Sequence, residues 1–237
     1  MIKRTNKENI IYIVCAVIFI SVLVYSGIRA LSIYIPQRNA SRKIENLKNT
    51  VGIRDEKAED ILNTEKSDKV NRADEGLIKL SEINSDFVGW MSIEDTVIDY
   101  PVLQSAAEDP EYYLYRDFDK NYSFSGSLFI GEGSDKDSDI FIVYGHNMSA
   151  DTMFGTLDSY KDAVFAEQHK NIVFRTPSEK RGYRVFAAFQ TQVYSEPTEK
   201  FEYYRFVGKL GRNAYNEAVE NYRNMSLISL NEAPKYP

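Results

Sequence analysis

The chain has very little cysteine: Cys15 is the single one among 237 residues. One cysteine excludes an intramolecular disulfide. Cys15 also lies within an apolar run, where a thiolate would be strongly desolvated, so we interpret it as an apolar filler and not as a nucleophile. A serine nucleophile finds no support either, because the chain contains no Gly-x-Ser-x-Gly elbow.

The chain also lacks an excess of basic residues. Its formal net charge is −6 and its pI is ≈ 5.2, and no basic patch with interleaved aromatics occurs. This composition excludes a nucleic-acid partner from the expected functions. The length and the 43% of hydrophobic residues predict one good-sized domain plus an accessory segment, and the 17 tyrosines are typical of a β-rich domain.

Charged residues are absent from residues 9–28, which are mostly Ile, Val, Leu, Phe and Tyr. A helix of about 20 such residues crosses the hydrocarbon core of a bilayer. Lys3, Arg4 and Lys7 precede this run, so we predict a cytoplasmic tail at residues 1–8, an uncleaved single-pass anchor at residues 9–35 and the rest of the chain outside the cell. A cleaved signal peptide is the alternative, but its apolar run would be shorter.

Residues 36–82 combine many charges of both signs with few aromatics. Apolar residues recur there at helical spacing in two thin stripes: Ile44, Leu47 and Val51, then Ala58, Ile61 and Leu62. We predict a helical stalk, punctuated by Gly52 and Gly76, that ends in a helix packed on the following domain. The heptads are too few for a coiled coil.

From residue 83 onward the pattern changes to a mainly β domain with helices. Strand-like runs lie at residues 87–93, 96–103, 127–130, 140–143, 172–174 and 183–189. Pro101 within the second run predicts an edge or bulged position. Short helices are predicted to begin at residue 152 and at residue 165. Helical spacing of apolar residues predicts a long amphipathic helix between residues 206 and 225.

Three alternating aspartates, Asp135, Asp137 and Asp139, have the spacing of a calcium loop. Such a loop needs a glycine where Ile140 stands, and no glutamate follows at the required distance. We therefore interpret this segment as a solvated turn and predict no metal site.

The stretch at residues 140–148 (Ile-Phe-Ile-Val-Tyr-Gly-His-Asn-Met) is the most informative one. Its first four residues predict a strand buried on both faces, and Gly145 lets the backbone turn after the strand. His146 follows the strand end, a position suited to acid–base chemistry near neutral pH. A histidine that only hydrogen-bonds the strand end is the alternative, and the local pattern alone favours it. His169 lies among polar residues and is predicted at the surface.

Several motifs occur together in a fixed order. They are residues 83–90 (Ile-Asn-Ser-Asp-Phe-Val-Gly-Trp), 98–104 (Ile-Asp-Tyr-Pro-Val-Leu-Gln), 112–114 (Tyr-Tyr-Leu), 117–118 (Asp-Phe), 126–129 (Gly-Ser-Leu-Phe) and 144–148 (Tyr-Gly-His-Asn-Met), then Met153, Phe154 and Leu157. Each motif is weak by itself, but their order and spacing are specific. From residue 83 to its end the chain resembles the class B sortases, which are membrane-anchored cysteine transpeptidases of Gram-positive cell surfaces. The long helix near the carboxyl end resembles the helical insertion of that class.

This resemblance implies a sortase-like β-barrel of about eight strands, formed by residues 83–237, whose groove binds a sorting peptide. It implies that His146 is the catalytic acid and base, and that Tyr144, Asn147 and Met153 belong to the substrate groove. The family also uses a cysteine nucleophile and an arginine, and neither has a counterpart in this chain. We expect both just beyond Pro237, so that the barrel is incomplete here and the chain as given is inactive.

The implied function is cleavage of a C-terminal sorting motif of surface proteins and their attachment to peptidoglycan. The implied partners are the sorting-signal peptide, a peptidoglycan amine and the membrane, and no metal or organic cofactor is implied. The alternative is a non-catalytic, membrane-tethered β-domain that binds a peptide or a cell-wall fragment. A structural stalk protein is a third possibility, which the neighbourhood of His146 disfavours. Three explanations compete: a truncated or incomplete sequence, a decayed gene, or a fragment with a non-catalytic role. We favour truncation, because the preceding residues keep the family pattern without visible erosion.

Overall fold

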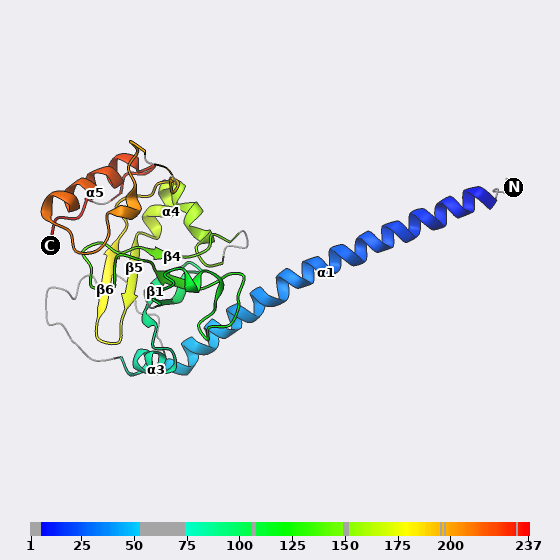
Figure 1. Ribbon diagram of the computed structural model, residues 1–237, viewed down its shortest axis with the longest axis horizontal. Coiled ribbons are helices and arrows are strands. Elements are labelled where there is room, and N and C mark those ends of the chain that lie inside the picture. Colours follow the sequence, from blue (N-terminus) through cyan, green and yellow to red (C-terminus); the bar gives the residue numbers. More distant parts are fainter. Residues whose placement is uncertain are drawn as a thin grey trace. The chain divides into compact units, whose positions relative to one another are not determined.

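The computed structural model describes residues 6–52, 74–105, 108–148, 152–194, 196, 198–230 and 232–237. The chain divides into two compact units, residues 1–43 and residues 44–237. Helix α1 (Asn6–Val51) makes up the first unit and continues into the second (Figure 1). Its segment Ile10–Leu31 is long and apolar enough to cross a membrane. This segment lies within the predicted anchor.

The predicted stalk begins inside α1, because the helix continues without interruption as far as Val51. Gly52, with φ of +66°, ends it as predicted. Gly76 is not a break, which corrects the prediction. It lies in the first turn of α3 (Glu75–Ile83), where the carboxylate of Asp74 accepts a hydrogen bond from its backbone N–H.

Ala58, Ile61 and Leu62, the second stripe of the stalk, lie outside the described residues. The domain boundaries at residues 8, 35 and 82 stay a prediction.

The second unit is built on one mixed sheet of six strands with the order β4-β3-β2-β1-β5-β6. The strands are β1 (Phe87–Ile93), β2 (Asp99–Leu103), β3 (Leu128–Ile130), β4 (Val143–Tyr144), β5 (Asn171–Arg175) and β6 (Lys180–Arg184). All neighbours are antiparallel except the parallel pair β2–β3. Within the described part of the chain β4 and β6 remain the two edges, so the sheet is open. The mainly β fold with an incomplete barrel is therefore confirmed.

Three predicted strands are wrong in extent. The run predicted at residues 96–103 is a strand only from Asp99 onward, in β2. The run at residues 140–143 is half-buried, and only Val143 joins the sheet, in β4. Ile140 instead exchanges backbone hydrogen bonds with Gly208, which holds it away from a ladder. The strand predicted at residues 183–189 is β6, which begins earlier, at Lys180, and ends at Arg184.

Pro101 lies in the interior strand β2 and not at an edge, which corrects the prediction. It pairs with Trp90 of β1, and the irregularity of that ladder lies between Phe87 and Gly89 instead. The ladder to β3 includes Val102 and Leu103 but not Pro101. The missing N–H of proline is tolerated because this second ladder starts one residue later.

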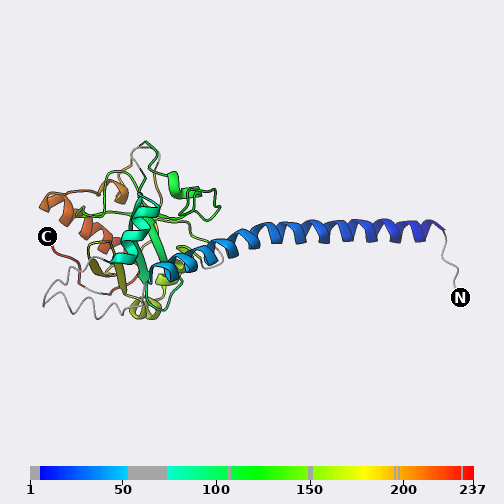
Figure 2. The same ribbon diagram turned by 90° about the horizontal axis from the view of Figure 1, so that it is seen from below.

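Short helices connect the strands. They are η1 (Tyr112–Tyr115), η2 (Gly155–Lys161), α4 (Ala163–Gln168) and η3 (Tyr203–Arg205), followed by the longer α5 (Arg212–Met225). The helix predicted from residue 152 begins only at Gly155, and the long helix begins at Arg212 instead of near residue 206. Residues 208–210 cannot join α5 because their backbone groups bond to residues 139 and 140. Helices α3 and α5 lie at opposite ends of this unit (Figures 1 and 2).

The core consists of two clusters of buried side chains, one centred on Val102 and Leu128 and the other on Trp90 and Phe118. Alternation along β1 and β2 sends side chains to both faces of the sheet, so both faces are covered by apolar groups. Every buried member of either cluster lies between Leu77 and Phe174.

Candidate active site

His146 lies two residues beyond β4, at the end of the strand where the sequence predicts it. Gly145 before it is absent from the positions with positive φ, so the backbone here does not need glycine for a left-handed conformation. Its role is close packing: a Cβ at this position would lie 2.4 Å from Cδ2 of Leu128 and 2.9 Å from Cδ2 of Phe154. The strand end is thereby pressed onto the core.

The imidazole of His146 is half-buried, and its Nε2 lies 2.8 Å from the backbone oxygen of Leu114. A carbonyl oxygen can only accept a hydrogen bond, so Nε2 is the nitrogen that carries hydrogen. The ring also packs against Tyr115, with centroids 5.1 Å apart. No group in the described part of the chain hydrogen-bonds Nδ1, so this atom is left for proton exchange.

The loop after His146 folds back on itself. The backbone oxygen of His146 accepts a hydrogen bond from the N–H of Phe154 at 3.0 Å, and Asn147 forms a β-bridge with Met153. Met153 has φ of +53°, which is strained for a residue with a side chain, and its N–H donates to the hydroxyl of Tyr100 at 3.2 Å. The structure therefore brings His146, Asn147 and Met153 together.

The three predicted groove residues have different surroundings. Tyr144 stacks on Phe129 with centroids 5.6 Å apart, and burial, followed by the neighbouring Tyr203, raises the pKa of its hydroxyl. Asn147 is exposed and donates to Asp158 at 2.8 Å. Met153 is only 6% exposed, and its side chain belongs to the core.

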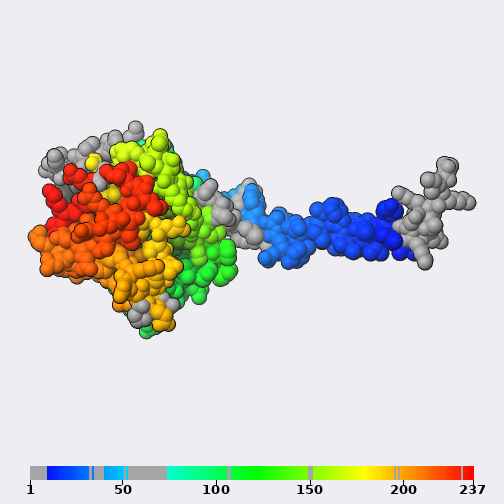
Figure 3. Space-filling model, turned by 90° about the horizontal axis from the view of Figure 1, so that it is seen from above, coloured from blue at the N-terminus to red at the C-terminus, as the bar shows by residue number. Residues whose placement is uncertain are grey.

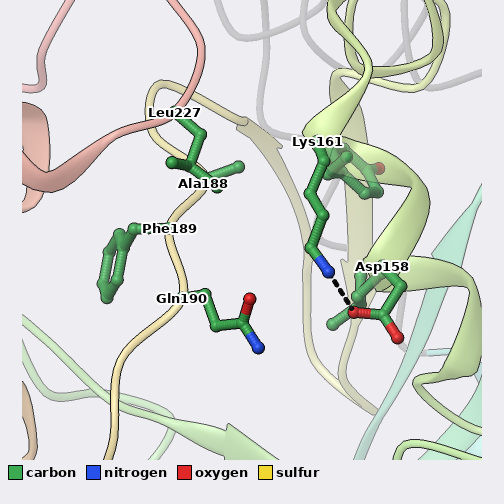
Figure 4. Close-up of a pocket in the computed structure, with 8 residues that line it drawn as sticks. Asp158, Lys161, Ala188, Phe189, Gln190 and Leu227 are labelled. Atoms are coloured by element: carbon green, nitrogen blue, oxygen red, sulfur yellow. Dashed lines mark hydrogen bonds and ion pairs between the residues drawn. The ribbon is translucent and has the colours of Figure 1, made fainter.

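A small cleft is lined by Asp158, which accepts the hydrogen bond from Asn147 of this loop (Figure 4). One wall is η2, where Asp158 and Lys161 form an ion pair with a distance of 3.2 Å, and the facing wall contains residues 188–190 (Figure 4). The hydrogen bonds from Asn147 and Lys161 lower the pKa of Asp158. The complete lining is Leu157, Asp158, Tyr160, Lys161, Ala188, Phe189, Gln190 and Leu227.

An aromatic cluster extends from α5 toward β4. Phe189 stacks on Tyr222 with centroids 5.7 Å apart and an interplanar angle of 10°. Burial, followed by the neighbouring Tyr203 and Tyr144, raises the pKa of Tyr222 to about 12. The surface of α5 and the segment after it is continuous on one face (Figure 3, orange to red).

Sequence reasoning missed two features of the site. The first is the partner of His146, the backbone oxygen of Leu114 in η1. A contact through a backbone carbonyl leaves no signature in side-chain identity. The second is the cleft, whose walls come from segments far apart in the chain and share no motif. His169, predicted at the surface, is half-buried, and its Nδ1 lies 3.0 Å from the backbone oxygen of Glu94.

The three alternating aspartates do not converge. Asp135 accepts the backbone N–H of Asp137 at 2.8 Å, Asp137 pairs with Arg181 at 2.7 Å, and Asp139 accepts the N–H of Leu210 at 2.8 Å. Hydrogen bonds from Lys136 and Arg181 lower the pKa of Asp137. Among the described residues, no group of three His, Cys, Asp or Glu side chains is placed to hold a metal ion.

No family model matches the chain. Two curated proteins resemble it: sortase B of Listeria monocytogenes, 36% identical over 117 residues, and sortase B of Staphylococcus aureus, 35% identical over 114 residues. Each match covers 47% of this chain and 46% of the relative, so the chain spans about half the length of the curated relatives it matches.

Solved structures extend the likeness to most of the fold. The crystal structure of Staphylococcus aureus sortase B matches with a TM-score of 0.64 and 26% identity, covering 83% of this chain and 84% of that chain. A Staphylococcus aureus sortase B–substrate complex has a TM-score of 0.66, with 24% identity and 85% of each chain covered. Sortase B complexed with triglycine has a TM-score of 0.67 and 24% identity, with 84% and 85% covered.

The fold is therefore that of the sortases. Both curated relatives and the crystal structure at 26% identity are sortase B, so the resemblance to the class B sortases predicted from the sequence is confirmed.

Proposed function

We propose that this chain is part of a sortase transpeptidase that cleaves a C-terminal sorting motif of surface proteins and joins them to a peptidoglycan amine. The observation that carries the proposal is the geometry of His146 at the end of edge strand β4. Its Nε2 is fixed by the oxygen of Leu114 at 2.8 Å, while Nδ1 is free of described partners. A histidine fixed through one nitrogen and open at the other is suited to general acid–base catalysis.

The proposed reaction needs a thiolate that attacks a backbone carbonyl of the sorting peptide. The peptide bond breaks, an acyl-enzyme thioester forms, and His146 protonates the departing amine. His146 then takes a proton from the peptidoglycan amine, which attacks the thioester and releases the thiolate. An arginine would stabilise the oxyanion.

Cys15 does not fit the role of this nucleophile. It lies in the apolar segment Ile10–Leu31 of α1 and is the single cysteine of the 237 residues. The proposed chemistry therefore needs a thiol that these residues do not provide, and we expect a polypeptide of these 237 residues to lack transpeptidase activity.

The partners follow from the related proteins. One sortase B structure is a complex with substrate and another is a complex with triglycine, a peptide with a free amine. These complexes support a sorting-signal peptide and an amine nucleophile as the partners of this chain. Tyr144 and Asn147, on either side of His146, are the proposed contacts to the peptide.

A cleavage assay tests the proposed reaction. A fluorogenic sorting peptide is incubated with the purified chain, and separately with the same chain extended by a Cys-bearing strand pair of a sortase B. We expect cleavage only by the extended chain, and its loss on His146→Ala but not on His169→Ala. An extended chain that is equally active with His146→Ala would contradict the role of His146.

A non-catalytic, membrane-tethered domain that binds a peptide or wall fragment is the second candidate. It is favoured by the position of the single thiol within the apolar segment of α1. Tight binding of the sorting peptide by the extended chain, without cleavage, would support it.

The proposed location is the cytoplasmic membrane, with the domain outside. The basic residues before the apolar segment support this orientation. Protease added to intact protoplasts is then expected to digest the domain and to leave a short anchored fragment. Full protection of the domain would show the opposite orientation.

A further inference from the structure

The η1 turn, which supplies the carbonyl that binds His146, is held by a polar network that is buried at Tyr113 and Asn84 and reaches solvent at Asp86 and Lys120. The side chain of Tyr113 is 1% exposed, and its hydroxyl donates to Oδ2 of Asp86 at 2.8 Å. The same hydroxyl accepts a hydrogen bond from Nδ2 of Asn84 at 3.0 Å, and Asn84 also donates to the oxygen of Phe118 at 2.8 Å. Asp86 in turn pairs with Lys120 at 2.9 Å.

This network connects η1 to the middle of the sheet. Asn84 and Asp86 lie immediately before β1, which pairs with β2 on one side and β5 on the other. Buried polar groups are costly when they lose a partner, because no water replaces it. The hydroxyl of Tyr113 is therefore anchored to the most firmly paired strand of the domain.

The carbonyl of Leu114, the next residue, has little freedom to reorient. Gly126 has φ of +58°, and a Cβ there would lie 2.2 Å from the oxygen of Leu114 and 2.7 Å from that of Tyr113. The oxygen of Tyr113 also accepts the N–H of Ser127 at 3.0 Å. The turn is thus fixed by its side chain on one side and by a closely packed glycine on the other.

We infer that Tyr113 is a positioning residue: through Asn84 and Asp86 it holds the Leu114 carbonyl against Nε2 of His146 and so selects the imidazole tautomer with hydrogen on Nε2. This inference rests on the proposed function for its catalytic meaning, since that tautomer leaves the Nδ1 lone pair for proton transfer. Its structural content is independent of any activity.

The second histidine provides an internal reference. His169 contacts the Glu94 carbonyl through Nδ1, so its neutral ring carries hydrogen on Nδ1, opposite to His146. The chain contains only these two histidines. A spectrum of the imidazole nitrogens therefore contains one ring of each kind.

The experiment is long-range 1H–15N spectroscopy of the full chain, labelled with 15N-histidine, in detergent micelles at mildly alkaline pH. We expect opposite tautomers for the two rings, assigned by His169→Gln. In Tyr113→Phe, the His146 nitrogens should move toward each other as the tautomers mix, while those of His169 stay unchanged. Tyr112→Phe is the matched control: its ring faces Arg116 at 4.5 Å, its hydroxyl has no described hydrogen bond, and no shift is expected.

A second variant covers the case in which Tyr113→Phe does not fold. Asp86→Asn keeps the shape and one acceptor oxygen, so it weakens the network without emptying it, and a smaller shift of His146 in the same direction is expected. A folded variant of either kind whose His146 keeps its tautomer unchanged would overturn the inference. The proposed function can fail in the cleavage assay while this result stands, so the two failures are distinguishable.

Discussion

The domain has two regions, residues 74–184 and residues 185–237, that differ in the interactions that stabilise them. The first region contains all six strands and all buried members of both core clusters. The second contributes α5 and extended segments, and its buried apolar residues within the described part of the chain are Tyr215, Ala218 and Val219. Isolated contacts attach it, such as the bridge of Gly208 to Ile140.

The difference shows that the two regions depend on different interactions. The first buries its apolar side chains between β1, β2 and β3, so its stability comes from packing within the region. The second packs with aromatic pairs such as Phe189 and Tyr222 and leaves much of its backbone outside any ladder. We therefore expect residues 185–237 to open at a lower free energy than the sheet.

Truncation of a core leucine should give the largest effect. Leu128 is 0% exposed, and Leu128→Ala is expected to lower the free energy of unfolding by about 3 kcal/mol because it leaves a cavity in the first region. Leu227, in the second region, is 59% exposed, and Leu227→Ala is the control, expected to have almost no effect. Urea unfolding of the full chain in detergent, followed by circular dichroism, measures both. Equal losses of unfolding free energy in the two variants would contradict the proposed difference between the two regions.

A methyl group added beside η1 should have the next largest effect. Gly126→Ala forces a side chain into the left-handed region and against the Leu114 carbonyl, at an expected cost of about 2 kcal/mol. Gly211 has φ of −71° and nothing within 4 Å of its missing Cβ. Gly211→Ala is expected to cost less than about 1 kcal/mol. Urea unfolding measures both variants. If Gly126→Ala leaves the free energy of unfolding unchanged, the turn at η1 can adjust to a side chain and is not rigidly held.

An ion pair within the second unit should give a smaller effect. Lys48 pairs with Asp99, which also accepts the indole N–H of Trp90 at 2.6 Å, and the paired side chains are 25% and 27% exposed. Lys48→Met is expected to cost about 1 kcal/mol, less at high salt. The control is Lys161→Met, whose pair with Asp158 is far more exposed, and no measurable change is expected there. If the loss of stability in Lys48→Met does not depend on salt, it reflects packing of the aliphatic part of the Lys48 side chain instead of the ion pair.

The smallest expected effect is on the stability of the folded chain at acidic pH, through Asp86. Burial alone would raise the pKa of Asp86, but hydrogen bonds from Lys120 and Tyr113 outweigh it and hold the pKa below the ordinary 3.8. The folded chain thus binds this proton less readily than the unfolded chain. The contribution is present above about pH 4 and is lost as pH falls through the lower folded value. Asp86→Asn should flatten the stability profile below pH 4, whereas Asp109→Asn, on an exposed loop, should leave it unchanged. Acid titrations followed by circular dichroism compare the variants.

Much of the first region could be predicted from sequence. The runs at residues 87–93 and 172–174 lie in β1 and β5, because apolar and β-branched patterns report burial, and burial dominates there. The position of His146 after a strand could be predicted for the same reason. The pattern at residues 140–143 failed because its bonding partner, Gly208, is remote in sequence.

The rest depended on contacts that side-chain identity does not encode. Pro101 led us to predict an edge strand, but it lies in an interior strand. Proline is tolerated there because the ladder between β2 and β3 begins one residue later. The Leu114 carbonyl that orients His146 is a backbone group, and any residue at that position would present it. The start of α5 was displaced because residues 208–210 bond to another loop.

The intrinsic fluorescence of Trp90 reports on the state of the first region. It is the single tryptophan of the chain, it is 0% exposed, and its indole donates to Asp99. Selectively excited emission therefore comes from the middle of the sheet, at the short wavelength of an indole shielded from water. If residues 185–237 open alone, this emission should stay native while helical circular dichroism from α5 falls. A red shift of the Trp90 emission then marks the unfolding of the sheet itself. Tryptophan fluorescence and circular dichroism therefore distinguish the unfolding of the two regions without any added label.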